Sequence, residues 1–433
     1  MKVGIAKVDL TPSIPVTIDG FGSRDKLSGG IEHQIEGVCA VFESGGTRLC
    51  IMGLDLLAVD DYMMVPLRRA ARDLGIPAKH VMINTSHGHA VPNTTPCRSF
   101  MRSYEEGYLE EARDKLCGLM HDAVGDLQEA RLDYTVGSCT LGMNRRSMEG
   151  LNRPNPTKPI DMDVPVLRVL APDGRTRALL FSYACHPVTV NGYDISPDFP
   201  GYAREMIAEK IPGCQPLFLQ GCGADINPRS LDPVQRRYAF GSVPESVELG
   251  HELGRAVLAA LSGTPMPLGE QLAADGEYVQ IPFGPQPTEE DVIAVEATGG
   301  FYATWAEAVR RVWDSGHKLP YQLPIEVLAF NIGGLYVIGM AAEVCAEVGL
   351  RIKQTLRDRT VCALGYCNGA WDYFAPREAH REAGYEHGYE VFTSFMDTVW
   401  PWVQPRGFSP DSEDILIESI IELLSGLDSM DGH

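Results

Sequence analysis

Short apolar runs rich in β-branched residues alternate along the chain with segments in which apolar residues recur every three or four positions. The first pattern is typical of buried strands and the second of amphipathic helices. The predicted strands, after an opening strand within 1–12, are 38–42, 49–54, 81–84, 164–170, 178–184, 217–220, 277–282, 326–331 and 335–339, and the predicted helices are 61–74, 104–130, 202–211, 247–261, 288–312, 345–356 and 413–424. This alternation predicts an α/β fold, a layered sandwich with a largely buried mixed sheet flanked by helices.

Two glycines and two irregular stretches add detail to this pattern. Gly333 and Gly334 lie between two predicted strands, and glycine tolerates the positive φ of a tight turn, so a hairpin is predicted there. Residues 142–159 and 365–388 follow no regular period, and their Arg, Trp and Tyr content favours binding loops. The sequence contains no evident internal repeat or linker, so residues 1–433 are predicted to form a single domain.

Charge and cysteine content narrow the classes of partner. The chain has 58 acidic and 37 basic residues and a formal charge of -21, which repels phosphate backbones and argues against a nucleic-acid partner. The most apolar stretch, 49–59, contains Asp55 and is far shorter than the roughly 20 residues of a membrane span. Eleven cysteines without a CxxC pair, and an opening segment without a secretory pattern, predict a cytoplasmic protein. The sequence leaves the oligomeric state open.

Two of the predicted strands end at histidines. His87 and His89 follow the strand 81–84, and residues two apart in an extended chain project to the same side, so both imidazoles are expected to face one site. His186 follows the strand 178–184 in the same way. Metal binding is one interpretation of these histidines. The alternative is that they are structural residues whose ring nitrogens bond the protein.

Two further strands end in a carboxylate or an amide. The strand 217–220 runs into glycines followed by Asp225 and Asn227, which is typical either of a ligand-binding loop or of a plain turn with a side-chain cap. The strand 335–339 leads to Glu343 just ahead of a helix, where a carboxylate can also serve the helix dipole. However, two histidines and a glutamate are one of the usual ligand sets of a catalytic zinc with an open position.

Taken in order, these segments resemble the catalytic domain of the neutral/alkaline (non-lysosomal) ceramidase family, and the resemblance runs across most of the chain. The segments that carry it are 4–11, Ser86-His87-Gly88-His89, His186-Pro187 with Asp198 and 201–203, Glu343 with Gly349 and Arg351, and Asn368 with Tyr373 and Tyr385-Glu386. The combination is more specific than any single motif among them. It implies a metal-dependent hydrolase built around one zinc ion.

The resemblance implies roles for individual residues of this chain. The zinc ligands would be His87, His186, Glu343 and Tyr373. The residues that orient the substrate and stabilise the oxyanion would be His89, Arg145, Asn227 and Tyr385. We further expect the polar residues Asn144, Asp198 and Asp225 to contribute to substrate binding.

Two departures from the family pattern affect the expected chemistry. Asn227 occupies the position of a family serine, and an amide cannot form an acyl intermediate, although its NH₂ group can donate to an oxyanion. The chain also ends soon after the catalytic segments, so the carboxy-terminal immunoglobulin-like domain of ceramidases is expected to be absent. A covalent serine mechanism is therefore not expected here, and the substrate is expected to differ from ceramide.

The sequence thus predicts a zinc-dependent hydrolase, a ceramidase-like amidohydrolase that cleaves an amide or ester bond of a small or lipid-like substrate with a metal-activated water. One alternative is a zinc hydrolase or lactonase for a small soluble polar or sugar-derived compound. Another is a metal-containing binding protein that has lost catalysis through the asparagine at position 227.

Overall fold

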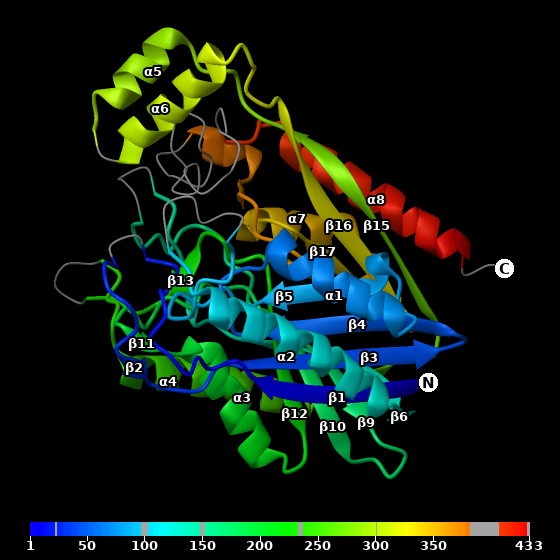
Figure 1. Cartoon of the computed structure of the whole chain (residues 1–433). Coiled ribbons are helices and arrows are strands. Elements are labelled where there is room, and N and C mark those ends of the chain that lie inside the picture. Colours follow the sequence, from blue (N-terminus) through cyan, green and yellow to red (C-terminus); the bar gives the residue numbers. More distant parts are fainter. Residues whose placement is uncertain are drawn as a thin grey trace.

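The computed structural model describes residues 1–21, 24–96, 103–147, 152–232, 237–299, 301–381 and 407–430. The predicted α/β class is confirmed, but the strands form three larger mixed sheets rather than one (Figure 1). Within these residues, no helix combines the length and apolar character needed to cross a membrane.

Each larger sheet contains a chain of antiparallel strands with one parallel strand at its edge. The first sheet has the order β5-β4-β3-β1-β6, the second β12-β10-β9-β7-β14 and the third β19-β17-β16-β15. The strands are β1 (Lys2–Asp9), β3 (Glu36–Ser44), β4 (Thr47–Leu54), β5 (Val81–Thr85), β6 (Gln128–Glu129), β7 (Arg131–Ser138), β9 (Asp163–Leu170), β10 (Thr176–Tyr183), β12 (Gln215–Gln220), β14 (Met266–Pro267), β15 (Leu272–Pro282), β16 (Gln322–Ile332), β17 (Leu335–Met340) and β19 (Thr360–Leu364).

The three sheets repeat one topology. In each of them, a helix connects the last antiparallel strand to the parallel edge strand: α1 (Asp61–Asp73), α3 (Asp198–Lys210) and α7 (Ala346–Thr355). A longer helix follows the edge strand and packs on the two outer antiparallel strands: α2 (Glu106–Gly125), α4 (Val243–Ala260) and α8 (Ser412–Met430). The repeat is not visible in the sequence because the three units share connectivity and not residues.

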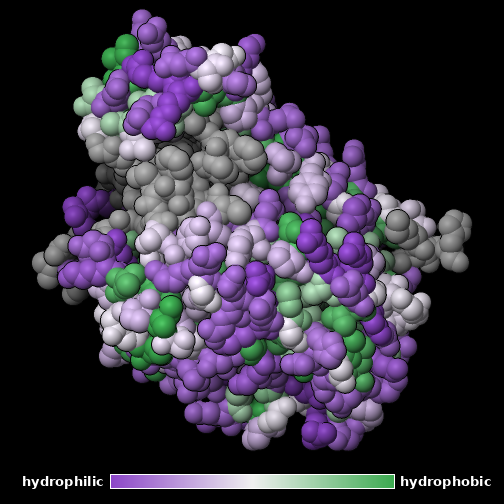
Figure 2. Space-filling view, viewed as in Figure 1, coloured by the Kyte–Doolittle hydropathy of each residue, from purple (hydrophilic) through white to green (hydrophobic). Residues whose placement is uncertain are grey.

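Apolar packing explains why the sheets lie together. One buried hydrophobic cluster contains side chains of all three sheets: Val3 and Phe42 of the first, Leu217 of the second, and Phe330 and Val337 of the third. Three other clusters fill the space between each sheet and its own helices. The helices therefore cover the outer faces and the sheets face one another (Figure 1). The visible surface is mostly hydrophilic with scattered apolar residues (Figure 2).

The ends of the three edge strands meet at the buried side chain of Asn84. Its Nδ2 donates to the carbonyls of Gln220 (3.1 Å) and Gly365 (2.8 Å), and its Oδ1 accepts from the amide of Gln220 at 2.6 Å. The side chain is fully buried, so these bonds are not shared with water. One asparagine thus joins the ends of β5, β12 and β19.

Some predicted elements differ from the observed ones. The predicted helix 288–312 is two helices, α5 (Glu289–Glu296) and α6 (Phe301–Asp314), because the chain reaches a φ of +77° at Gly299 between them. These helices have a small core of their own around Trp305 and lie at one end of the molecule, beyond the sheets (Figure 1). Strands β7 and β19 were not predicted, and α3 begins at Asp198 rather than at residue 202.

Short elements complete the fold. The predicted hairpin at Gly333 and Gly334 is confirmed, with φ values of 61° and 100° between β16 and β17. Both irregular stretches contribute to two-stranded pairs near the edge-strand ends. The remaining elements are β2 (Gly30–Ile31), β8 (Gly142–Asn144), β11 (Asp194–Ile195), β13 (Ile226–Pro228), β18 (Glu343–Val344), β20 (Tyr373–Phe374) and the 3₁₀ turns Ala78–His80 and Arg377–Arg381.

Candidate metal centre

Each of the three sheets supplies one side chain to a buried site at the strand ends. His87 lies two residues beyond β5, His186 lies three residues beyond β10 and Glu343 lies three residues beyond β17. Their side chains are at most 4% exposed. The topological repeat therefore brings together three residues that are far apart in the sequence.

The separations of their polar atoms match those of ligands around one small cation. Nε2 of His87 and Nε2 of His186 lie 3.2 and 3.4 Å from the same oxygen, Oε2 of Glu343. Neither His186 Nε2 nor Glu343 Oε2 has a hydrogen-bond partner, although both are buried. In tetrahedral zinc sites with bonds of about 2.0–2.1 Å, ligand atoms are about 3.3 Å apart. The three side chains therefore fit a zinc-sized ion.

Backbone carbonyls fix the orientation of both imidazoles. Nδ1 of His87 lies 2.9 Å from the carbonyl oxygen of Leu57, and Nδ1 of His186 lies 2.9 Å from that of Gly223. Such a bond places the proton on Nδ1 and leaves the lone pair of Nε2 facing the site. Both rings are thus held in the tautomer that binds a metal.

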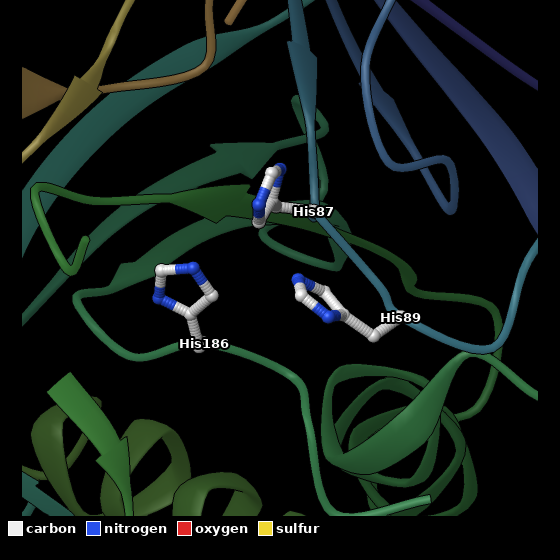
Figure 3. Close-up of side chains that lie close together, drawn as sticks. All are labelled: His87, His89 and His186. Atoms are coloured by element: carbon white, nitrogen blue, oxygen red, sulfur yellow. The ribbon is translucent and has the colours of Figure 1, made fainter. Parts of the chain in front are cut away.

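His89 completes a group of three histidines that could hold a metal ion, with ring nitrogens within 4.8 Å of one another. Figure 3 shows His87, His89 and His186 turned toward a common space. The ring of His89 lies 5.1 Å from that of His87 and 5.6 Å from that of His186. Neither of its nitrogens has a protein partner. His89 is therefore free to contact either an ion or a substrate.

The electrostatics favour the protonation states that bind a cation. Burial and the nearby Arg145 lower the pKa of His186 to about 4. Burial and then the imidazoles of His87 and His186 lower the pKa of His89 well below its ordinary value. Burial alone would raise the pKa of Glu343, but His87 and His186 hold it well below its usual range. Neutral imidazoles beside a charged carboxylate are the forms that ligate metals.

Tyr373 and Arg145 form a second wall of the site, next to Glu343. The pairing of β18 with β20 sets Tyr373 directly opposite Glu343. Nη2 of Arg145 donates to Oη of Tyr373 at 3.1 Å, and Nη1 donates to Oδ1 of Asn227, also at 3.1 Å. Nδ2 of Asn227 in turn donates to Oδ1 of Asn152 at 3.0 Å. The structure thus groups Arg145, Asn227 and Tyr373, while the predicted roles of Arg145 and Asn227 in catalysis and of Tyr373 in zinc binding stay predictions.

Asn144 and Asp225 lie behind this wall. The Asp225 carboxylate is fully buried and accepts from Asn144 Nδ2 (3.0 Å), Arg146 Nε (2.7 Å) and the amide of Ala346 (2.8 Å). Burial opposes its charge, but the guanidinium of Arg146 keeps the pKa of Asp225 below its ordinary value. These contacts tie the β8–β13 pair to the start of α7. The predicted role of Asn144 and Asp225 in substrate binding stays a prediction.

Asp198 holds the loop that follows His186. Its carboxylate accepts from the amide of Val190 (3.0 Å), the amide of Phe199 (2.6 Å) and the hydroxyl of Ser246 (2.6 Å). Burial raises the pKa of Asp198 despite these donors. The bonds connect the loop that follows His186 to α3 and α4. Substrate contact by Asp198 stays a prediction, and the remaining predicted residue, Tyr385 with its neighbour Glu386, lies outside the described residues.

Tyr366 is a site residue that the sequence analysis did not find. It is fully buried, its ring centroid lies 4.5 Å from that of His87, and its hydroxyl has no hydrogen-bond partner. Burial and the nearby Glu343 carboxylate raise its pKa well above the ordinary value. The sequence did contain a signal, because Tyr366 follows an apolar run just as His87 does. That run is β19, which the sequence pattern did not identify as a strand.

Comparisons with known proteins give the fold a name. No protein-family model matches the chain, and no curated protein matches it in sequence. Among solved structures, the neutral ceramidase of Pseudomonas aeruginosa is similar over 98% of this chain and 73% of its own, with a TM-score of 0.75 and 18% identity. A ceramidase complexed with C2 is similar over 99% and 75% of the two chains, with a TM-score of 0.76 and 18% identity. The fold that the sequence resemblance predicted is therefore confirmed: this chain has the fold of neutral ceramidase.

Proposed function

We propose that the chain is a zinc-dependent hydrolase that cleaves an amide or ester bond in a substrate with an apolar acyl group. The observation that carries the proposal is the convergence of His87, His186 and Glu343 from three sheets, with two imidazole nitrogens 3.2 and 3.4 Å from one carboxylate oxygen. Buried polar atoms without partners are costly unless a ligand satisfies them. The likeness to ceramidases in fold supports the same proposal.

The protein residues around the ion would have different roles in binding and catalysis. When bound, zinc supplies Lewis-acid activation of a carbonyl group and of a water molecule. His89 has two free ring nitrogens on the rim of the site and would bond the substrate there. Arg145 carries a fixed positive charge held by Asn227 and Tyr373, and it would stabilise the oxyanion that develops during attack.

A row of aromatic side chains beside His89 supports an apolar substituent on the substrate. The ring of Phe21 lies 5.1 Å from His89 and 6.1 Å from Phe240, which stacks on Tyr238 at a centroid distance of 6.1 Å. Phe21 and Phe240 are partly exposed. Such a surface binds acyl chains by removing apolar area from water. We therefore favour a lipid-like amide over a small polar lactone.

The test begins with the metal and continues with turnover. We expect the purified protein to contain about one zinc per chain and to hydrolyse short-chain N-acyl sphingosine or another N-acyl amide. Chelation should abolish the activity and zinc should restore it. Glu343→Gln should lose both zinc and activity, whereas His121→Ala, on a side chain that is 76% exposed, should lose neither.

The substrate panel also separates the alternatives. Water-soluble amides and lactones belong in the same assay, and turnover of these compounds alone would contradict the lipid-like substrate. A zinc-loaded protein that turns over no member of the panel would instead support a metal-containing binding protein. A preparation without zinc, in which added zinc also fails to bind, would overturn the proposal itself.

A further inference from the structure

We propose that Tyr366 is a further substrate-contacting residue of this site, whose hydroxyl donates a hydrogen bond to the carbonyl or carboxylate oxygen of a bound acyl compound. The inference rests on the proposed function, because it takes the metal centre as the place where the acyl group binds. It adds to the site a hydrogen-bond donor beside His87.

The fold repeat places Tyr366 where the first unit has a candidate ligand. Tyr366 lies two residues beyond the edge strand β19, and His87 lies two residues beyond the edge strand β5. Both residues have a left-handed backbone, with φ values of 57° and 60°, which is uncommon for residues other than glycine. Tyr366 in the third unit is thus the counterpart of His87 in the first.

Backbone hydrogen bonds hold Tyr366 in this conformation. Its amide donates to the carbonyl of Ala342 at 2.9 Å, directly before Glu343, and its carbonyl accepts from the amide of Thr85 at 3.2 Å, two residues before His87. Tyr366 is therefore bonded to the two segments that carry candidate ligands. Strained conformations that the surroundings enforce in this way are concentrated at functional sites.

The side chain lies among the candidate ligands. Its ring centroid is 4.5 Å from that of His87 and 6.1 Å from that of His186, with the latter contact edge-on. Tyr366 is fully buried. Its ring therefore forms part of the wall of the metal centre.

The hydroxyl of Tyr366 differs from those of two other buried tyrosines, Tyr108 and Tyr183. Tyr108 donates to the carbonyl of Leu10 at 2.8 Å, and Tyr183 donates to the carbonyl of Cys139 at 3.1 Å. The hydroxyl of Tyr366 is equally covered but has no partner. Phenylalanine would fill the same space without burying an unpaired donor. A hydroxyl at this position is accounted for if its hydrogen-bond partner is an oxygen atom of the bound ligand.

A donor at this position suits the chemistry of acyl hydrolysis. The carbonyl oxygen of an amide or ester gains negative charge during attack, and the product is a carboxylate. A neutral hydroxyl on a buried, packed ring can donate to both with little reorganisation. Because the hydroxyl is one donor among several, its removal should weaken the reaction without abolishing it.

The test compares Tyr366→Phe with Tyr321→Phe, which alters a tyrosine that is 60% exposed. The probe is sodium octanoate, added to the zinc-loaded proteins in a calorimeter. A hydrogen bond to a charged group corresponds to about a 10–100-fold change in Kd, so we expect Tyr366→Phe to weaken octanoate binding by that factor. Zinc content should stay unchanged, and the melting temperature without zinc should equal or exceed that of the parent protein. Tyr321→Phe should match the parent in all respects.

Three outcomes decide against the inference. Octanoate binding that is as tight in Tyr366→Phe as in the parent, or absent from the parent at millimolar concentration, would overturn it. A loss of zinc from Tyr366→Phe would make Tyr366 a metal ligand instead, which also overturns it. If the parent hydrolyses no substrate but Tyr366→Phe still weakens octanoate binding, the proposed function fails while the inference stands.

Discussion

The two sides of the candidate site are built in different ways. His87, His186 and Glu343 stand just beyond strands of three different sheets, and backbone carbonyls orient both imidazoles. Asn227 lies on β13, Tyr373 lies on β20 and Arg145 directly follows β8, and side-chain hydrogen bonds from Arg145 hold the three residues together. The first side depends on the fold as a whole, whereas the second depends on a few side chains.

This difference suggests a division between metal binding and catalysis. The side built on strand ends is preorganised by many backbone bonds, so changes elsewhere should scarcely move it. The side chains of the second wall, Arg145, Asn227 and Tyr373, can be altered one at a time without disturbing one of the three larger sheets. We therefore expect variants of the first side to lose the metal and variants of the second side to keep it while losing rate.

The largest effect is expected for His186→Ala. Loss of a partner that merely orients a ligand typically lowers metal affinity about 10–100-fold, and loss of the ligand itself should cost more than that. We expect zinc affinity to fall beyond this range and hydrolysis to become undetectable. Competition with a zinc-binding dye measures the affinity, with His121→Ala as the matched control. Zinc binding of unchanged strength in His186→Ala would exclude this histidine as a ligand.

The next effect is expected for Arg145→Met, which keeps most of the side-chain volume but removes the charge. Removal of one oxyanion-stabilising donor typically lowers kcat by about 10²–10³-fold. We expect a loss of this size with the zinc content of the parent protein. Steady-state kinetics and metal analysis on the same preparation check both points. If Arg145→Met also lost its zinc, the proposed division between the two sides would be wrong.

The strand-end side of the site was largely predictable from the sequence, and the reason is local. His87, His186 and Glu343 each follow an apolar run, and the end of a buried strand can be read from a few consecutive residues. That these ends converge was implied by the family resemblance. Neither periodicity nor composition could supply it, because convergence depends on how three sheets pack together.

The features that the sequence did not reveal depend on contacts between distant segments. Tyr366 could be recognised as a site residue only once β19 was known to be the edge strand of a third sheet. Asn84 is unremarkable in the sequence, yet its side chain joins residues 136 and 281 positions away. The break between α5 and α6 had a local signal in Gly299, which the helical period on either side concealed.

A smaller effect, on stability, is expected for Asp225→Asn. This variant tests how far Asp225 supports the second wall of the site, which contains Arg145. Removing one partner of a buried ion pair costs about 3–5 kcal/mol, because it leaves the guanidinium of Arg146 with one carboxylate fewer. We expect a loss near the lower limit at pH 7, because asparagine still accepts a hydrogen bond. Urea denaturation measures it, and Asp122→Asn, at a side chain that is 74% exposed, is the control.

The pH dependence of this loss follows from the pKa of Asp225, which lies below its ordinary value in the folded state. The charged carboxylate stabilises the folded protein fully above its unfolded pKa of about 3.9. That stabilisation is lost as the pH falls through the lower pKa of the folded state. The difference between parent and Asp225→Asn should therefore be constant from pH 7 to 5 and shrink below about pH 4. A difference that instead grew toward acid pH would contradict the assignment.

The smallest effect is expected for Ser246→Ala. This variant tests whether backbone hydrogen bonds alone keep His186 in position. The hydroxyl of Ser246 donates to Asp198, two bonds away from the loop that follows His186. Its removal leaves the carboxylate with its two amide donors, so we expect a loss of about 1 kcal/mol in urea denaturation. Zinc affinity should change by less than the roughly 10-fold lower limit for partners that orient a ligand directly. A larger fall in zinc affinity would mean that His186 is positioned by the side chains around Asp198 and not by Gly223, and the contrast between the two sides of the site would no longer hold.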